Sequence, residues 1–134
     1  MPGSDKTILL IDDDPFLAEM YSLKFQESGF LVKTASDGQQ AIDQLESGLI
    51  PDIILLDVVM PHLDGFEVLK VIKSKEKLKL IPVVLLTNVG QKEDVERGIS
   101  LGADDYIVKA HFTPSEVVAR ISTLLDHRKS IGGA

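Results

Sequence analysis

The sequence contains no cysteine, which excludes disulfide bonds and metal sites built from thiolates. No apolar run approaches the roughly 20 residues that a membrane-spanning helix needs, so we expect no membrane insertion. Met1 is not followed by a basic stretch and an apolar core, and we therefore expect no secretory signal. These absences are consistent with a cytoplasmic protein.

Basic residues are also in short supply, with 14 Lys and Arg against 21 Asp and Glu. The net charge of −7 disfavours contact with the phosphate backbone, and we predict no direct nucleic acid binding by this chain. The 134 residues fit one domain, and a 44% apolar fraction can form a sizeable core. We expect this domain at residues 1–127, with a short flexible tail at residues 128–134.

Short apolar runs alternate with segments of helical spacing five times along the chain. Three of the runs, ILLI, IILL and VVLL, are continuously apolar, which is typical of parallel strands covered by helices on both faces. The five expected strands are Thr7–Ile11, Leu31–Ala35, Asp52–Leu56, Pro82–Leu86 and Asp105–Val108.

The segments between these runs carry residues that begin and end helices. Asp64 with Glu67, and Thr113 with Glu116, have the spacing of a capping box. The expected helices begin behind Asp14, at Ser36 or Asp37, behind Asp64, at Lys92 and behind Thr113, and Gly29, Gly48 and Gly102 end three of them. Five strand–helix units predict a parallel sheet whose functional crevice lies at the carboxyl ends of the strands.

Polar residues stand directly behind four of the five apolar runs. Asp12, Asp13 and Asp14 follow the first run, Asp57 the third, Thr87 the fourth and Lys109 the fifth. Taken singly, Asp14 predicts only a helix cap and Lys109 only a surface lysine. Because the carboxyl ends of parallel strands meet at one edge, the sequence predicts that these residues gather in one site.

A cluster of carboxylates needs compensation. Two carboxylates about 4 Å apart repel by roughly 4 kcal/mol at an effective dielectric near 20, so a proton is retained or a cation is bound. Oxygen ligands without Cys or His favour a hard cation, and Mg²⁺ fits best. With Lys109 and Thr87 nearby, the set suits phosphoryl transfer: Asp57 attacks phosphorus, Lys109 stabilises the phosphoryl oxygens, and Thr87 donates a hydrogen bond.

The sequence resembles the response-regulator receiver family from about Thr7 to Asp126. The segment ILLIDDDPF resembles the acidic-pair motif with Asp12 and Asp13, and ILLDVVMPHLDGFEVL carries Asp57 at the family spacing. Thr87 matches the hydroxyl position behind VVLL, and GADDYIVK carries Tyr106 and Lys109 at the positions of the aromatic switch residue and the lysine.

The resemblance implies a flavodoxin-like, doubly wound sheet of five parallel strands in the order 2-1-3-4-5. It also implies that a sensor histidine kinase or a histidine phosphotransfer protein phosphorylates Asp57, and that Mg²⁺ contacts Asp13, Asp57 and the carbonyl of Val59. Asp12 is implied to act largely through water. Thr87 and Tyr106 would then switch the surface of the fourth helix, fifth strand and fifth helix, which a downstream protein reads.

Under this reading the domain is no enzyme in the ordinary sense, because it catalyses only its own phosphorylation and dephosphorylation. The sequence leaves open the kinase, the downstream partner, homodimerisation through the last elements, and whether an output domain belongs to the protein. His62, His111 and His127 are scattered, and we expect them at the surface rather than at a metal.

The sequence departs from the family pattern at two positions. Ala110 follows Lys109 where the family usually has a proline, and a non-proline cis bond costs ~3–4 kcal/mol. We therefore predict a trans Lys109–Ala110 peptide that redirects the chain. Asn88 stands where a small residue is usual and could crowd the site or add a hydrogen bond. Val59 and Val89 flank the site, and our hypothesis is that they hinder an attacking water and slow dephosphorylation.

Three alternatives remain at this stage. A haloacid-dehalogenase-type phosphatase would use Asp12 and Asp14 but leaves Asp57 without a role and has Pro15 in place of the usual Thr or Val. A flavodoxin-type electron carrier needs a phosphate-binding loop behind the first strand, and here that loop is triply acidic. A degenerate receiver would act as a binding module without phosphorylation, which the departures at Asn88 and Ala110 leave open.

Overall fold

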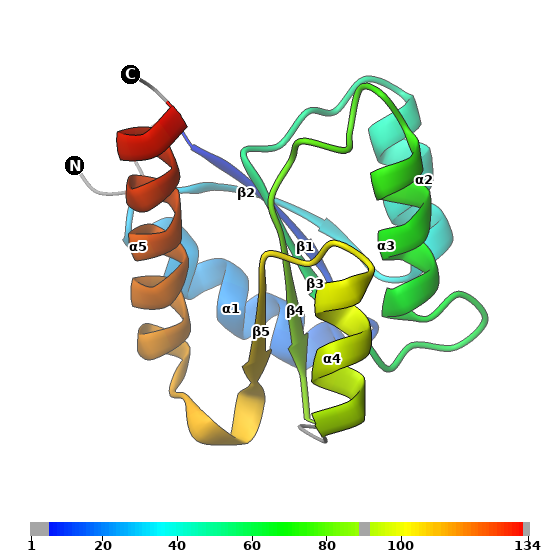
Figure 1. The fold of residues 1–134 in the computed structure, drawn as a ribbon. Coiled ribbons are helices and arrows are strands. Elements are labelled where there is room, and N and C mark those ends of the chain that lie inside the picture. Colours follow the sequence, from blue (N-terminus) through cyan, green and yellow to red (C-terminus); the bar gives the residue numbers. More distant parts are fainter. Residues whose placement is uncertain (1–5, 89–91, 133–134) are drawn as a thin grey trace.

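The computed structural model describes residues 6–88 and 92–132, with side chains through residue 126. Five strands and five α-helices alternate, and a short 3₁₀ turn, η1, precedes the last helix (Figure 1). The strands are β1 (Thr7–Ile11), β2 (Leu31–Ala35), β3 (Ile53–Asp57), β4 (Val83–Thr87) and β5 (Asp105–Val108). The helical elements are α1 (Pro15–Glu27), α2 (Gly38–Glu46), α3 (Gly65–Ser74), α4 (Lys92–Ser100), η1 (Lys109–His111) and α5 (Pro114–Gly132).

The strands form one parallel sheet in the order β2-β1-β3-β4-β5, which confirms the predicted fold. Helices α1 and α5 cover one face, and α2 and α3 cover the other (Figure 1). Successive residues of β1 serve opposite faces: Leu9 and Ile11 pack toward α2 and α3, whereas Ile8 and Leu10 pack toward α1 and α5. The central strands are therefore apolar throughout because both of their faces are buried.

Two strands, β3 and β4, begin and end one residue later than the predicted Asp52–Leu56 and Pro82–Leu86. Asp57 and Thr87 are the last residues of β3 and β4 rather than the first residues behind them. Asp57 pairs with Leu86, and Thr87 pairs with Val108, so both polar residues keep their place in the ladder. The apolar pattern ends before the ladder does because buried polar residues occupy the final strand positions.

The predicted helix signals hold with one refinement. Asp37, rather than Ser36, caps α2, and its carboxylate accepts a hydrogen bond from the Gln40 amide at 2.8 Å. Both capping boxes form, at Asp64 with Glu67 and at Thr113 with Glu116. The three predicted stop glycines, Gly29, Gly48 and Gly102, all have positive φ, which explains why glycine occupies these positions.

The last helix continues beyond the expected end of the domain at residue 127, since its backbone is helical to Gly132. The domain boundary and the flexibility of residues 128–134 stay predictions. Within the described residues, no helix has the length and apolarity to cross a membrane.

Candidate functional site

The carboxyl ends of the strands surround a cleft of about 370 Å³. It is lined by Asp12, Asp13, Asp14, Leu17, Asp57, Val59, Thr87, Asn88 and Lys109. The cleft therefore brings together every residue that the sequence predicted for catalysis or metal binding. Tyr106, the predicted second switch residue, is not part of its lining.

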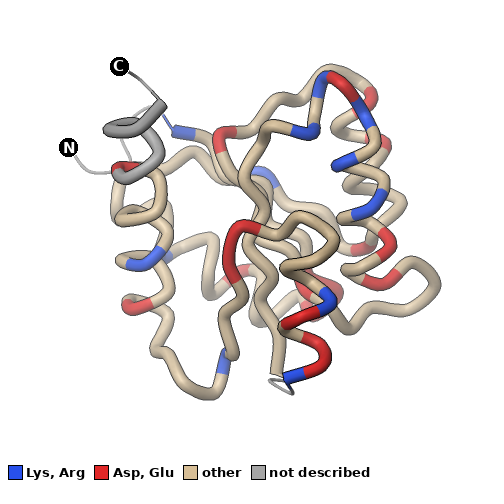
Figure 2. Tube along the Cα trace, in the orientation of Figure 1, with Lys and Arg blue, Asp and Glu red and all other residues tan. Residues whose placement is uncertain are grey.

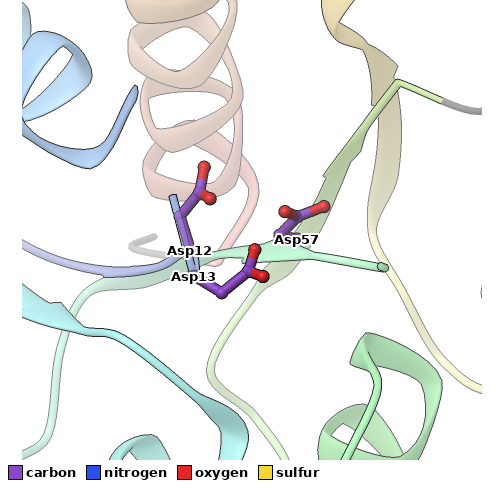
Figure 3. A group of neighbouring side chains, drawn as sticks. All are labelled: Asp12, Asp13 and Asp57. Carbon is purple, nitrogen blue, oxygen red and sulfur yellow. The ribbon is translucent and has the colours of Figure 1, made fainter. Parts of the chain in front are cut away.

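Three carboxylates meet in this cleft. Asp12, Asp13 and Asp57 each offer an oxygen, and these oxygens all lie within 4.8 Å of one another (Figure 3). Asp12 and Asp57 are buried, with 2% and 6% of their surface exposed, whereas Asp13 is exposed. Figure 3 shows Asp12 and Asp13 at the end of one strand and Asp57 at the end of its neighbour.

The backbone fixes two of these carboxylates. Asp12 accepts a hydrogen bond from the Asp14 amide at 2.9 Å, and Asp57 accepts one from the Val59 amide at 3.3 Å. Asp14 itself is used as the cap of α1, where its carboxylate accepts hydrogen bonds from the amides of Phe16 and Leu17. The plain reading of Asp14 as a helix cap is thus confirmed.

Lys109 supplies the positive charge. Its Nζ donates a hydrogen bond to Asp12 Oδ2 at 3.2 Å and lies 3.5 Å from Asp57 Oδ2. Only 7% of the lysine side chain is exposed, so solvent screens these ion pairs weakly. Each buried charge in the cleft therefore has an opposite charge or a backbone donor beside it, as burial requires.

The pKa of Asp57 is raised to about 6, chiefly by burial and also by the charge of Asp12, against an opposing effect of Lys109. Burial alone would lower the pKa of Lys109, but the Asp57 and Asp12 carboxylates outweigh it and raise that pKa above its ordinary value. The carboxylate set thus carries more negative charge than one lysine offsets, which favours a bound cation.

Tyr21 is a neighbour of the site that the sequence did not single out. It lies on α1 and is only 3% exposed. Burial raises the pKa of its phenol, Lys109 lowers it, and the charges of Asp12 and Asp57 raise it. Tyr21 thus lies within electrostatic range of the cleft, which no periodicity argument could reveal. Leu17 of α1 also lines the cleft.

The two predicted switch residues occupy different environments. Thr87 is fully buried at the end of β4. Tyr106 is partly buried on β5, with its ring close to Gly98 of α4. Burial raises the pKa of Tyr106, and the charges of Asp94 and Asp57 raise it further. The tyrosine therefore lies between the carboxylate site and α4.

The departures from the family pattern are visible in the structure. No cis peptide occurs among the described residues, so the trans prediction for Lys109–Ala110 is confirmed, and the chain continues in the turn η1. Asn88 is exposed at the cleft, and Val59 is 60% exposed beside it. Val89, the other half of the dephosphorylation hypothesis, lies outside the described residues, as does the side chain of His127.

The two described histidines, His62 and His111, are exposed, as predicted. They take no part in the carboxylate cluster. His62 has a φ of 67°, which makes it a non-glycine residue in the left-handed region, in the loop between β3 and α3.

The donor set fits Mg²⁺. It consists of hard oxygen ligands from three carboxylates around an open cleft. A nearby cation also stabilises the ionised form of a buried carboxyl whose pKa is raised, as that of Asp57 is. The exposed Asp13 keeps one side of the cluster accessible to water, which Mg²⁺ retains in most protein sites.

Comparison with known proteins agrees with this fold and site. Residues 8–122 match the family described as "Response regulator receiver domain". The chain is 40% identical over 121 residues to the alkaline phosphatase synthesis transcriptional regulatory protein PhoP of Bacillus subtilis, covering 90% of this chain and 49% of that protein. It is also 40% identical over 118 residues to the transcriptional regulator RpaA of Synechocystis, covering 88% and 48%. The chain thus spans about half the length of these relatives.

Solved structures resemble the chain over nearly their whole length. The chemotaxis protein CheY4 of Vibrio cholerae superposes with a TM-score of 0.82 at 30% identity, covering 88% of this chain and 97% of that one. The receiver domain of the Francisella response regulator 1452 superposes with a TM-score of 0.83 at 31% identity, covering 93% and 100%.

The fold and the acidic cleft define a doubly wound α/β domain with its site at the carboxyl edge of the sheet. The chain belongs to the response regulator receiver domain family of two-component signalling. Family membership removes the phosphatase and electron-carrier alternatives, and Asp14 is in any case occupied as a helix cap.

Proposed function

We propose that this domain receives a phosphoryl group on Asp57 from a phosphohistidine, and that the modification alters the surface formed by α4, β5 and α5. The observation that carries the proposal is the position of Asp57 beside a lysine ammonium at 3.5 Å and two further carboxylates. Asp57 ends its strand with a side chain that is buried yet lines the cleft.

In the proposed reaction, an Asp57 carboxylate oxygen attacks phosphorus while the phosphorus–nitrogen bond to the donor imidazole breaks. The imidazole keeps the electron pair of that bond and takes a proton from solvent. Lys109 stabilises the charge on the phosphoryl oxygens, because its ammonium already lies between Asp57 and Asp12. Thr87 ends the neighbouring strand, and in this proposal its hydroxyl donates a hydrogen bond to one of these oxygens.

Mg²⁺ bound by Asp12, Asp13, Asp57 and the Val59 carbonyl would neutralise part of the transferred charge. The arrangement of the chain supports this assignment, since a dianionic phosphoryl group on Asp57, beside the carboxylates of Asp12 and Asp13, needs more than one lysine. The donor would be a sensor histidine kinase or a histidine phosphotransfer protein, and the domain would act only on itself.

The first experiment is intact-mass spectrometry after incubation with Mg²⁺ and acetyl phosphate or phosphoramidate. We expect a gain of one phosphoryl group that EDTA prevents and that Asp57→Asn lacks. Asp126→Asn, which alters an exposed residue of α5, is the matched control and should be modified like the unaltered protein. A gain that persists in Asp57→Asn would refute the assignment of the acceptor.

The second candidate is a binding module that is never phosphorylated. It is favoured by Asn88 at the cleft and by Ala110 behind Lys109. Absence of both phosphorylation and beryllofluoride binding would support it. Reverting Asn88→Ala and Ala110→Pro would then show whether these two positions are responsible.

A further inference from the structure

The short turn that begins at Lys109 has few local restraints. It consists of Lys109, Ala110 and His111 in a single 3₁₀ turn with no side-chain cap. The hydrogen bond that closes it, from the Phe112 amide to the Lys109 carbonyl, is long at 3.3 Å. Ordering a backbone segment costs conformational entropy, so this turn needs support from elsewhere to hold the lysine in place.

Phe112 is where the turn meets the rest of the domain. Its ring is partly buried and packs against the apolar core between the sheet and helices α1 and α5. The guanidinium of Arg120 lies over the same ring, with Cζ 5.5 Å from the ring centroid. Phe112 is thus held between the core and an arginine of α5.

Arg120 is itself fixed by two hydrogen bonds. Its Nε donates to Asp105 Oδ2 at 2.8 Å, and its terminal nitrogen donates to Asp105 Oδ1 at 3.0 Å. Asp105 Oδ1 also accepts a hydrogen bond from the Tyr106 amide at 2.8 Å, so the acceptor is held by its own strand. An exposed ion pair usually contributes little, but this bidentate geometry fixes the direction of the guanidinium.

These contacts form a closed circuit around the lysine. Asp105 begins β5, and Lys109 follows the end of that strand directly. The turn leads to Phe112, the ring meets Arg120, and Arg120 returns to Asp105. These contacts therefore connect the start of β5, the turn and α5. Among the residues of this circuit, Lys109 is the one whose side chain lines the cleft.

We propose that Arg120 is a positioning residue for Lys109, acting through the ring of Phe112 and the turn Lys109–His111. Its effect on phosphorylation rests on the function proposed above, whereas its effect on the lysine does not. Arg120 does not line the cleft, and its proposed effect on the chemistry passes through the lysine.

The direct test observes the lysine itself by NMR in unphosphorylated, metal-free protein. The ¹⁵Nζ resonance of Lys109 is assigned by its loss in Lys109→Arg. We expect Arg120→Ala and Phe112→Ala to shift or broaden this resonance, and Arg120→Lys to restore it in part. Lys79→Ala, which removes an exposed 2.9 Å ion pair on the loop before β4, is the control and should leave the resonance unchanged.

The second test measures the rate of phosphorylation by phosphoramidate at a temperature at which each variant is fully folded by circular dichroism. We expect Arg120→Ala to lower the rate about fivefold, because a small displacement of a charge-stabilising group is costly. Mg²⁺ affinity, measured by calorimetry, should change less than twofold, since the metal-binding carboxylates lie outside the circuit.

The outcomes separate the two proposals. An unchanged Lys109 resonance in Arg120→Ala would overturn the positioning role, even if the rate fell. An equal loss of rate in Lys79→Ala and Arg120→Ala would overturn it as well, because it would indicate general destabilisation. If the unaltered protein is never phosphorylated, the proposed function fails, while the NMR result still decides the role of Arg120.

Discussion

At the scale of single residues, the burial of Asp57 opposes the ionisation of its carboxyl group. The folded protein binds the Asp57 proton more tightly than the unfolded chain does, because burial raises the pKa from 3.8 to about 6. The resulting stabilisation is complete below about pH 4 and is lost as the pH rises through 6. At neutral pH without metal, the ionised carboxylate therefore costs stability.

This predicts that Asp57→Asn is more stable than the unaltered protein at pH 7.5 in EDTA, by about 2 kcal/mol after allowance for hydration of the cleft. The advantage should disappear near pH 4, where both proteins carry a neutral side chain. Urea denaturation at the two pH values measures it. Asp126→Asn is the control and should change stability by less than about 0.5 kcal/mol at either pH. A less stable Asp57→Asn at pH 7.5 would contradict the prediction.

Val59 carries a second prediction at this scale. Its side chain is 60% exposed at the cleft and offers no hydrogen bond to a water near Asp57. If phosphorylation occurs, we expect Val59→Asn to shorten the lifetime of the phosphoryl group several-fold, because an amide can orient the attacking water. The decay is followed by intact mass after removal of the donor. Val59→Leu should not accelerate it, and an unchanged lifetime in Val59→Asn would rule out this role.

The sequence predicted those site residues whose type and position behind a strand indicate their chemistry. Asp12, Asp57, Thr87 and Lys109 stand at strand ends, and the sheet brings them together. Tyr21 could not be found in this way, because its helical spacing is that of any core residue. Its nearness to Lys109 depends on how α1 packs on the sheet, and a periodic pattern does not record that distance.

At the scale of elements, the approach of α3 to β3 determines where Asp57 lies. A Cβ atom on Gly65 would overlap the carbonyl oxygen of Asp57 and lie 2.7 Å from Val58 Cα. Both neighbours are backbone atoms, and the Gly65 amide donates to the Val58 carbonyl at 2.8 Å. The first residue of α3 must therefore be glycine for the helix to begin this close to the strand.

Gly65→Ala should accordingly destabilise the protein by about 3 kcal/mol and weaken Mg²⁺ binding, since the backbone of Asp57 must move. Gly98→Ala is a matched comparison within α4, where the added Cβ meets the end of the Leu85 side chain at 2.5 Å. A side chain can move aside and alanine favours the helix, so we expect a loss of at most about 1 kcal/mol. Urea denaturation ranks the two variants, and equal losses would show that the backbone contact is not decisive.

Element boundaries show how far the sequence could lead. Capping residues and stop glycines located helix ends well, because each satisfies a local backbone requirement. The ends of β3 and β4 were each misplaced by one residue, since hydrophobicity cannot reveal a polar residue that is buried for chemical reasons. The trans Lys109–Ala110 peptide could be predicted from the sequence. The support of the turn by Arg120 could not, because it comes from contacts between residues that are distant in the sequence.

At the scale of the whole molecule, charge is distributed unevenly between the two ends of the parallel strands. The carboxylates of the cleft lie at the carboxyl edge, whereas lysines gather at the end of α3 and in the loop leading to β4 (Figure 2). In a protein with a net charge of −7, the cluster of three carboxylates in the cleft attracts divalent cations. Metal binding and folding stability should therefore be coupled.

The coupling can be stated as a thermal shift. A ligand that binds only the folded state at about 100 times its dissociation constant adds about 2.7 kcal/mol. For a chain of this size we expect saturating Mg²⁺ to raise the melting temperature by about 10 °C at pH 7.5. Asp13→Asn should abolish most of the rise, and an equal ionic strength of NaCl should not reproduce it.

Asp57→Asn makes this prediction sharper because its two effects have opposite signs. In EDTA the variant should melt above the unaltered protein, since it lacks the buried negative charge. With saturating Mg²⁺ the difference in melting temperature between the two proteins should narrow or reverse, since the negative charge of Asp57 then binds the cation. Differential scanning calorimetry at matched ionic strength measures both. A constant difference between the two proteins across the Mg²⁺ titration would mean that Asp57 is not a ligand, and the metal would then have to be assigned to Asp12 and Asp13 alone.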